Sequence, residues 1–291
     1  MFILIYTFLL LTTLTGFAAE ADLEVSAPTY TNNNHSFSIR RNQGKSIGTT
    51  SSYTTVEGFS FPIKYDNFWP FIDVRFHKFD HKGEHALNLG VGYRLTPNGS
   101  SQIYGLNVYY DHRRIDHSNF NQIGLGFEIL GQIWGFRLNG YLPVAVKSHR
   151  NSFCFYDCYL GDYFFQKETF NDSLRGINFE IEALIATFNL GDIRLSIAPY
   201  YFHNKKGCRN HAFGSQFRLC ANITQYFTAN IIGSYDTVFK GQVQVQLGLT
   251  IPFNISDNLI TVQNQNARLF RPVHRIETLV LKKRNRYTTN F

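Results

Sequence analysis

The stretch Glu84–Leu95 reads EHALNLGVGYRL, in which apolar side chains alternate with glycine or polar ones. Successive side chains of an extended strand point to opposite faces. The leucines, Val91 and Tyr93 therefore share one face, whereas Asn88, the two glycines and Arg94 share the other. A period of two over this length indicates a β-strand with one dry face and one polar face.

The same period recurs from Val56 to Phe253, as in Tyr104–Asp111 and Gln122–Leu130. Short breaks rich in Gly, Pro, Asn and Asp lie at 66–67, 97–101, 131–132, 189–192 and 223–225, and longer polar breaks lie at 79–83, 112–118, 147–172, 203–210 and 236–240. Outer-membrane barrels alternate short periplasmic turns with long outer loops, and their strand number is even. A weaker segment at Ser36–Arg41 would supply the last strand. The pattern predicts an all-β protein, a transmembrane antiparallel β-barrel of about twelve strands over residues 36–253.

Soluble sandwiches and lipocalin-type barrels also alternate, so the composition of the polar face decides between the classes. That face is rich in Gly, Asn, Gln, Arg and Glu, which suits a crowded polar lumen. The charged side chains predicted to face the lumen are Asp73, Arg75, Arg94, Asp111, Glu128, Arg137, Glu180, Glu182, Arg194 and Arg218. Aromatic residues at strand ends suit interfacial girdles: Trp69, Tyr93, Tyr110, Trp134, Tyr141 and Tyr235.

The N-terminal residues 1–21 form an apolar run followed by small residues, which predicts a secretory signal peptide. No Lys or Arg precedes the run, so a retained anchor is the alternative. Residues 22–35 would be a periplasmic segment. No later run reaches the ~18 apolar residues of a membrane-spanning helix, so the chain would cross a membrane as a closed barrel.

The basic charge is concentrated at the C-terminus. The formal net charge is +7, and residues 267–291 hold seven Lys and Arg against Glu277 alone. A nucleic-acid-binding fold would spread a basic patch over its surface, so no nucleic-acid partner is expected. The tail 254–291 could thread a lumen lined by the acidic residues named above, as a plug or a remnant of a linker. A disordered basic tail is the alternative.

Apparent chemical sites carry little weight. His77, His81 and His85 straddle a strand, loop and strand, so their helical spacing is irrelevant to metal binding. We expect no metal, no cofactor and no catalytic residues, because no Ser/His/Asp arrangement is recognisable. The protein is therefore expected not to be an enzyme. Cys154, Cys158 and Cys208 lie in the two longest loops, where a disulfide could form in an exported chain. Free thiols are the alternative.

The last alternating segment reads QLGLTIPF from Gln246 to Phe253. Its pattern of polar Gln246, then Gly248, apolar Ile251 and aromatic Phe253 resembles the β-signal that the barrel-assembly machinery recognises in a closing strand. The placement at the end of the barrel supports this interpretation.

A family resemblance rests on four motifs in order: GVGYR at 90–94, GLNVYYD at 105–111, GLGFE at 124–128 and NGYLP at 139–143. These resemble the β-domain of inverse autotransporters, the intimin and invasin family. The resemblance implies a twelve-stranded outer-membrane barrel that anchors an adhesive passenger C-terminal to it. Only 38 residues follow Phe253 here, so no passenger is expected within this sequence.

The expected protein is a non-enzymatic component of the bacterial outer membrane, exported through the inner membrane, with a structural or surface-interaction role. The expected partners are outer-membrane lipid, periplasmic chaperones and the barrel-assembly machinery, together with host-cell or envelope proteins at the exposed loops. The alternative function is a small-solute porin, in which the tail leaves the lumen open.

Overall fold

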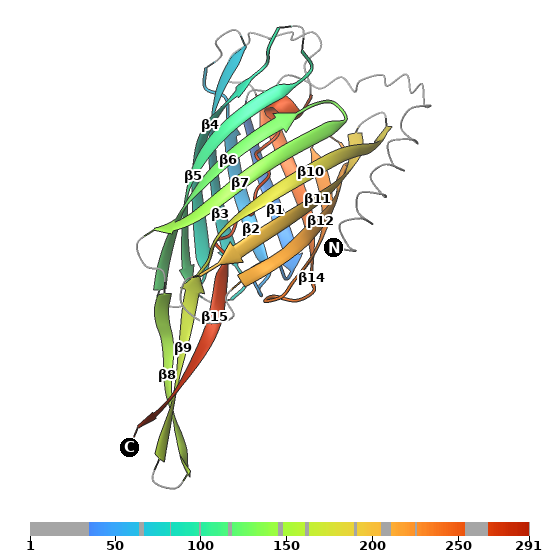
Figure 1. Ribbon diagram of the computed structural model, residues 1–291. Helices are drawn as coiled ribbons and strands as arrows, with labels where there is room; N and C mark the ends of the chain where they lie inside the picture. The colour runs from blue at the N-terminus through green and yellow to red at the C-terminus, as the bar shows by residue number, and fades with distance from the viewer. Residues whose placement is uncertain are drawn as a thin grey trace.

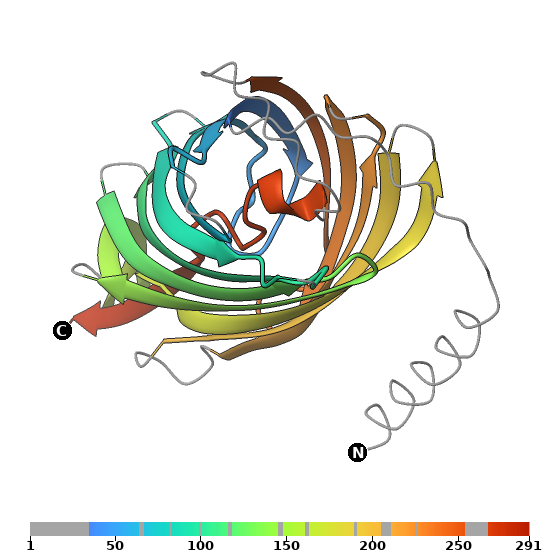
Figure 2. The ribbon, with the colours of Figure 1, turned by 90° about the horizontal axis from the view of Figure 1, so that it is seen from above.

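The computed structural model describes residues 35–63, 67–81, 83–98, 100–115, 118–144, 148–160, 163–188, 191–204, 211–224, 226–253 and 267–290. In these residues, twelve antiparallel strands close into a barrel (Figures 1 and 2). They are β1 (His35–Gly44), β2 (Tyr53–Ser60), β3 (Phe68–Phe79), β4 (His85–Leu95), β5 (Ile103–Ile115), β6 (Ser118–Leu130), β7 (Trp134–Val144), β10 (Arg175–Phe188), β11 (Gly191–His203), β12 (His211–Asn222), β13 (Phe227–Asp236) and β14 (Gln242–Phe253). The predicted fold class is confirmed.

The ring closes where β1 pairs with β14, from His35 opposite Phe253 to Gly44 opposite Gln244. The segment predicted at Ser36–Arg41 is thus a full strand. The predicted break 112–118 is mostly strand, because β5 continues to Ile115 and β6 begins at Ser118. We call the end of the barrel that holds the turns from β6 to β7 and from β12 to β13 the short-turn end. The opposite end, which holds the connection from β1 to β2, is the long-loop end.

The prediction of a polar loop at 147–172 is wrong. This stretch contains two long strands, β8 (Ser148–Leu160) and β9 (Tyr163–Ser173), which form a hairpin. The barrel passes from β7 directly to β10, so the hairpin stands outside the ring. A strand from the C-terminal segment, β15 (Leu281–Asn290), pairs with β9 and makes a three-stranded sheet. Figure 1 shows this sheet projecting from the long-loop end.

The faces of the barrel follow the period of two. On β4 the outward residues Leu89 and Val91 are 45% and 58% exposed, whereas the inward Asn88 and Arg94 are each 1% exposed. An apolar outer face and a polar inner face are the inverse of a soluble barrel and suit a lipid surround. In the part of the chain described, no helix is long and apolar enough to cross a membrane.

Two of the six aromatic residues predicted for the interfacial girdles are wrongly assigned. Trp69 and Tyr141 are 0% and 1% exposed and lie inside the barrel near its ends. Tyr110, Trp134 and Tyr235 are exposed, as that prediction requires. Trp69 has the same parity along β3 as Asp73 and therefore points to the same side, which explains the error.

Candidate functional site

The C-terminal segment lies inside the barrel and crosses it from end to end. A 3-10 helix, η1 (Ala267–Phe270), begins the described part of this segment, and Figure 2 shows it within the ring. We call residues 268–281 the lumen segment. Its chain then leaves the long-loop end as β15, since β9 and the connection between β7 and β10 lie there. The segment therefore joins the two ends of the barrel.

Apolar contacts hold the lumen segment at both ends. At the short-turn end, Leu269 and Val273 pack in a buried cluster with Trp69, Ile103 and Leu130. At the long-loop end, Val280 packs with Ile47, Tyr141 and Phe202, and Leu279 and Leu281 pack with Phe120. The inward aromatic residues at the strand ends thus serve as docking surfaces for the segment.

Ion pairs join the three arginines of the lumen segment to the wall. Arg268 lies 2.5 Å from Glu182, and Arg271 lies 3.1 Å from Asp192. Arg275 donates to both oxygens of Asp111, at 2.8 and 2.5 Å. Each guanidinium meets a carboxylate on a different strand, so the charges fix the height of the segment in the barrel. Charge-assisted and bidentate pairs of this kind are strong and geometrically selective.

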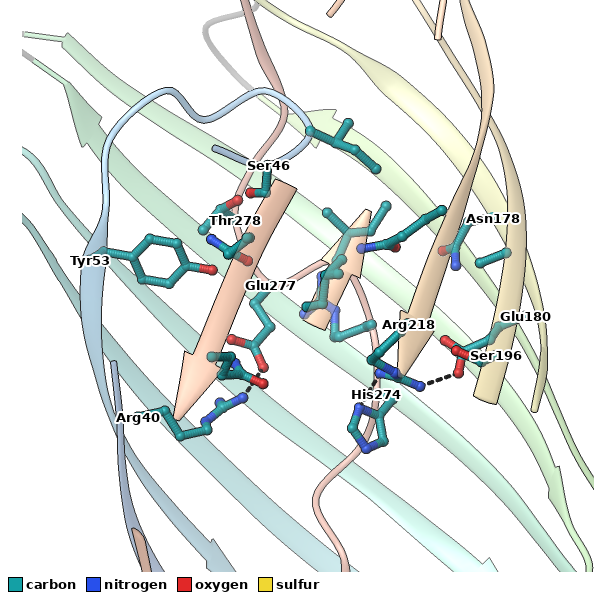
Figure 3. A pocket seen from close by; sticks show the side chains of 18 residues that line it. Arg40, Ser46, Tyr53, Asn178, Glu180, Ser196, Arg218, His274, Glu277 and Thr278 are labelled. Atoms are coloured by element: carbon teal, nitrogen blue, oxygen red, sulfur yellow. Dashed lines mark hydrogen bonds and ion pairs between the residues drawn. The ribbon is translucent and has the colours of Figure 1, made fainter. Parts of the chain in front are cut away.

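The segment also supplies a carboxylate. Glu277 Oε1 lies 2.8 Å from a guanidinium nitrogen of Arg40 on β1 and 2.8 Å from one of Arg75 on β3. Arg75 also contacts Asp73 and Glu57. Figure 3 shows Arg40 and Glu277 facing each other beside the β1 wall. Glu277 therefore bridges two strands of the wall through the segment.

The ten side chains predicted to face the lumen all lie within the barrel, nine of them buried and Arg218 partly so. They form chains of ion pairs along the wall. Arg94 lies 2.7 Å from Glu128, and Arg137 lies 3.0 Å from Glu180 and 2.8 Å from Glu182. Arg218 pairs with both glutamates, and Arg194 pairs with Asp192 at 2.9 Å. Arg94 also donates at 2.7 Å to the carbonyl of Arg271 in the lumen segment.

Sequence reasoning missed several members of this network: Arg40, Glu57, Glu84, Arg113, Asp192 and Glu277. Strand parity could have found two of them, because Arg113 shares a face with Asp111 and Asp192 shares a face with Arg194. Arg113 donates to Glu84 and, at 2.6 Å, to the carbonyl of Leu279. The pairs with Glu277 and with the three arginines of the lumen segment could not be predicted, because they depend on the path of that segment.

Glycines in the strands make room for this packing. A Cβ on Gly124 would lie 2.7 Å from Arg275, and one on Gly90 would lie 2.2 Å from the ring of Tyr109. Tyr109 in turn donates a 2.6 Å hydrogen bond to Asp73. The Gly-x-Gly motifs at 90–92 and 124–126 are thus sites of close packing in the lumen.

The seam residues of the predicted β-signal divide between the two faces. Gln246 donates at 2.7 Å to Asn42 across the seam and accepts at 2.6 Å from Asn230. Gly248 leaves room beside Thr228 and Arg40. Ile251 and Phe253 are 63% and 44% exposed on the outer face.

His77, one of the three closely spaced histidines in the sequence, is buried and hydrogen-bonds Thr55 at 2.8 Å and Asn88. No group of three His, Cys, Asp or Glu positioned to hold a metal occurs among the described residues. The side chains of Cys154, Cys158 and Cys208 lie outside the described residues, as do residues 1–34. Beyond the long-loop end of β3, a hydrogen bond from Arg41 lowers the pKa of Asp80 below its ordinary value.

The likeness to a known family in sequence covers β2 to β8 and the first two residues of β9. Residues 50–164 match the inverse autotransporter β-domain. The four motifs described above fall within this match, so the resemblance to the inverse autotransporter β-domain is confirmed over these residues. No curated protein sequence matches the chain.

Among solved structures, a protein from a study of in-meso crystallization of membrane proteins shares 14% identity and covers 86% of this chain and 99% of its own, with a TM-score of 0.60. An outer-membrane channel from Pseudomonas putida F1 shares 10% identity over 80% of this chain and 100% of its own, with a TM-score of 0.46. The β-domain of the Bordetella autotransporter BrkA shares 10% identity over 76% and 100%, with a TM-score of 0.37. At these identities the likeness is one of fold. The inverse autotransporter match and the closed barrel with its apolar outer face place the protein in the bacterial outer membrane.

Proposed function

We propose that this protein is a non-enzymatic outer-membrane anchor of the intimin and invasin type, whose barrel holds its own C-terminal segment and presents it at the cell surface. The observation that carries the proposal is the path of that segment. It enters at the short-turn end, is held by ion pairs and apolar clusters, and continues as β15 beyond the long-loop end. Outer-membrane barrels turn their long loops outward, so β15 would lie outside the cell.

The proposal also includes the route of the protein to the outer membrane and its contacts there. Residues 1–21 would act as a signal peptide, and 22–35 would remain in the periplasm. Chaperones there and the barrel-assembly machinery would deliver and close the barrel, with the seam residues of β14 as the recognised signal. The projecting sheet of β8, β9 and β15 is the surface proposed to contact host or envelope proteins.

The charge balance of the lumen supports the role of a resident segment. Asp111, Glu182 and Asp192 each meet an arginine of the lumen segment. Buried carboxylates are costly unless they are paired. In an open small-solute porin, Asp111 would lose its arginine, whereas Glu182 and Asp192 would keep only wall arginines: Arg137, Arg218 and Arg194. The contacts therefore favour an occupied barrel over the porin alternative.

Single-channel conductance in planar bilayers tests the proposal. The intact protein should show no large steady conductance, and deletion of residues 255–291 should produce one. Deletion of 282–291 alone is the matched control, because it removes β15 but leaves the lumen segment, and it should leave the conductance low. A large conductance in the intact protein that deletion of 255–291 does not change would favour the porin.

A further inference from the structure

The lumen segment does not fill the barrel evenly. Its two apolar ends pack mainly against β3, β5, β6, β7 and β11, and also contact clusters that include Phe59 of β2 and Ala212 of β12. Two cavities lined by described residues remain beside β12, β13, β14 and β1, with volumes of about 170 and 70 Å³, and the smaller one also reaches β10 and β11. Both are bordered by Arg40, Gln246, His274 and Glu277. They are therefore stacked along one wall of the barrel.

The larger cavity lies toward the short-turn end. Ser36 at the start of β1 and Pro252 near the end of β14 line it, and so does Thr224 in the turn after β12. All three residues are partly exposed to solvent. Deeper in, Asn230 and Cys220 line the same cavity, with exposed fractions of 5% and 8%. The cavity thus extends from solvent-exposed residues into the barrel interior.

The polar atoms around these cavities indicate water. Among the described residues, Arg40 Nε, Arg218 Nε, Asn230 Oδ1 and Glu277 Oε2 are buried without a hydrogen-bond partner. Buried polar atoms in native proteins almost always have partners, which include ordered water. A single ordered water needs a cavity volume of roughly 10–15 Å³. Both cavities are therefore large enough to hold water. Figure 3 shows Arg40, Arg218 and Glu277 around the smaller cavity.

The long-loop end of this wall is closed by apolar contacts. The turn between β1 and β2 folds inward with Ser46 and Thr49 bridged, and it places Ile47 against Val280 and Phe202. Gly48 has a φ of 70°, and a Cβ there would lie 2.8 Å from Val280. Only glycine suits both the positive φ and this close approach. Ile47 is 2% exposed and lines the outer part of the smaller cavity.

We infer that the occupied barrel contains a hydrated side chamber, open at the short-turn end and sealed at the long-loop end by Ile47, which admits small uncharged polar solutes from the periplasm. Its wall offers hydroxyl and amide groups from Ser38, Asn230 and Gln246, with its charged groups of both signs close to one another. Such a lining hydrogen-bonds neutral polar molecules without selecting for a net charge. The chamber rests on the position of the lumen segment and not on any role of β15.

The thiol of Cys220 reports on access to the chamber. The folded full-length protein is treated with methyl methanethiosulfonate, a small uncharged thiol reagent, and the peptide that contains Cys220 is followed by mass spectrometry. We expect modification of Cys220 in the folded protein, and at least a tenfold slower rate when Asn230→Phe fills the chamber. Ile231→Phe is the matched control, because Ile231 is 54% exposed on the outer face of the same strand.

A poly(ethylene glycol) maleimide should not modify Cys220 in the folded barrel, because the chamber is narrow. If Cys220 reacts with neither reagent until the protein is unfolded, the chamber is not open. If Asn230→Phe folds, as judged by its heat-modifiable gel mobility, and leaves the rate unchanged, the reagent does not enter through the chamber. Thr228→Phe, on the same face of β13, provides a second filling variant should Asn230→Phe fail to fold.

Conductance tests the seal. With the tail intact, Ile47→Ser should raise the conductance above that of the wild type, whereas Lys45→Ser, an exposed substitution in the same connection, should not. Equal conductance in wild type and Ile47→Ser would show that Ile47 is not the barrier. These readouts separate the chamber from the proposed anchoring role. Failure of the tail deletion to open a pore would count against the plug, whereas Cys220 modification reports on the chamber alone.

Discussion

Glu277 shows how single residues fix the lumen segment. Its carboxylate lies between the guanidiniums of Arg40 and Arg75, and the exposed fractions of those two side chains are 14% and 1%. Buried ion pairs add little to stability compared with a well-packed apolar core, but removal of one partner leaves a buried charge behind. The value of such a residue is therefore best measured by deleting its charge.

The substitution Glu277→Gln should destabilise the folded barrel by about 1–3 kcal/mol, less than the loss of a buried charge's only partner, because Arg40 keeps Glu57 and Arg75 keeps Asp73 and Glu57. The midpoint of urea unfolding, followed by heat-modifiable gel mobility, measures the change. Glu168→Gln is the control, since its partner Arg150 is 56% exposed and such pairs contribute about 0–1 kcal/mol. Equal effects of the two substitutions would contradict the bridging role of Glu277.

The glycine at position 90 tests the packing of the lumen wall. A methyl group there would meet the ring of Tyr109 and disturb the hydrogen bond from Tyr109 to Asp73. Gly90→Ala should therefore lower stability by about 1–3 kcal/mol, the range for overpacking. Gly140→Ala is the matched control on β7, because a Cβ there would have none of the described atoms within 4 Å. The same unfolding midpoint serves as the measurement, and a drop only at Gly140 would refute this view of the wall.

At the scale of elements, alternation revealed the barrel strands because each has one face in lipid and one in the lumen. The hairpin of β8 and β9 has no such constraint, since it stands outside the ring. Its pairing also shifts register between Arg150 and Ser152 and between Phe155 and Tyr159. Such irregularities interrupt the period of two, which explains why residues 147–172 resembled a loop in the sequence.

The pairing of β15 could not be predicted from the sequence either, because the paired residues of β15 and β9 are 108 to 126 positions apart in the chain, from Leu281 with Ser173 to Asn290 with Phe164. The sequence showed that the C-terminal segment is basic, but it did not show which of the basic residues lie inside the barrel and which lie outside. Arg268, Arg271 and Arg275 lie in the barrel, whereas the four basic residues from Lys282 to Arg286 lie on β15. That division depends on the length of the barrel, which only the folded strands define.

The seam strand β14 carries a prediction about assembly. Phe253→Ala should reduce the amount of heat-modifiable barrel in the outer membrane several-fold, because the proposed β-signal would lose its terminal aromatic residue. Phe213→Ala is the matched control, as Phe213 is a 67% exposed aromatic residue on the outer face of β12. The folded fraction is measured in isolated outer membranes. An equal loss for both variants would assign the effect to lipid contact instead.

The strand β15 carries a second prediction at this scale. Leu281 is 7% exposed and packs with Phe120 and Leu279 where the chain leaves the barrel. Leu281→Asp should detach β15 and make its basic residues sensitive to trypsin added to whole cells. Lys283→Asp, at an exposed position of the same strand, should leave the cleavage rate close to that of the wild type. Cleavage equal to that of the wild type in Leu281→Asp would contradict the anchoring contact.

At the scale of the whole molecule, the barrel and the lumen segment form one electrostatic unit. Asp111, Glu182 and Asp192 each have an arginine of the segment among their partners. Deletion of residues 255–291 should therefore lower the urea midpoint of the barrel, whereas deletion of 282–291 should change it little. Unfolding is again followed by heat-modifiable mobility. A barrel equally stable without its tail would show that water replaces these partners without cost.

The path of the C-terminal segment also has a consequence for the order of biogenesis. The seam between β1 and β14 forms an unbroken ring around residues 268–280, while 281–290 are paired outside it. A chain that leaves β14 at the short-turn end can reach this arrangement in two ways. In the first, the ring closes before the C-terminus passes through it. In the second, the last strands close around a segment that already lies in the lumen. Once β15 has paired with β9, the segment can be withdrawn only after the hydrogen bonds between these two strands are broken. Strand β15 therefore locks the C-terminal segment in the closed barrel.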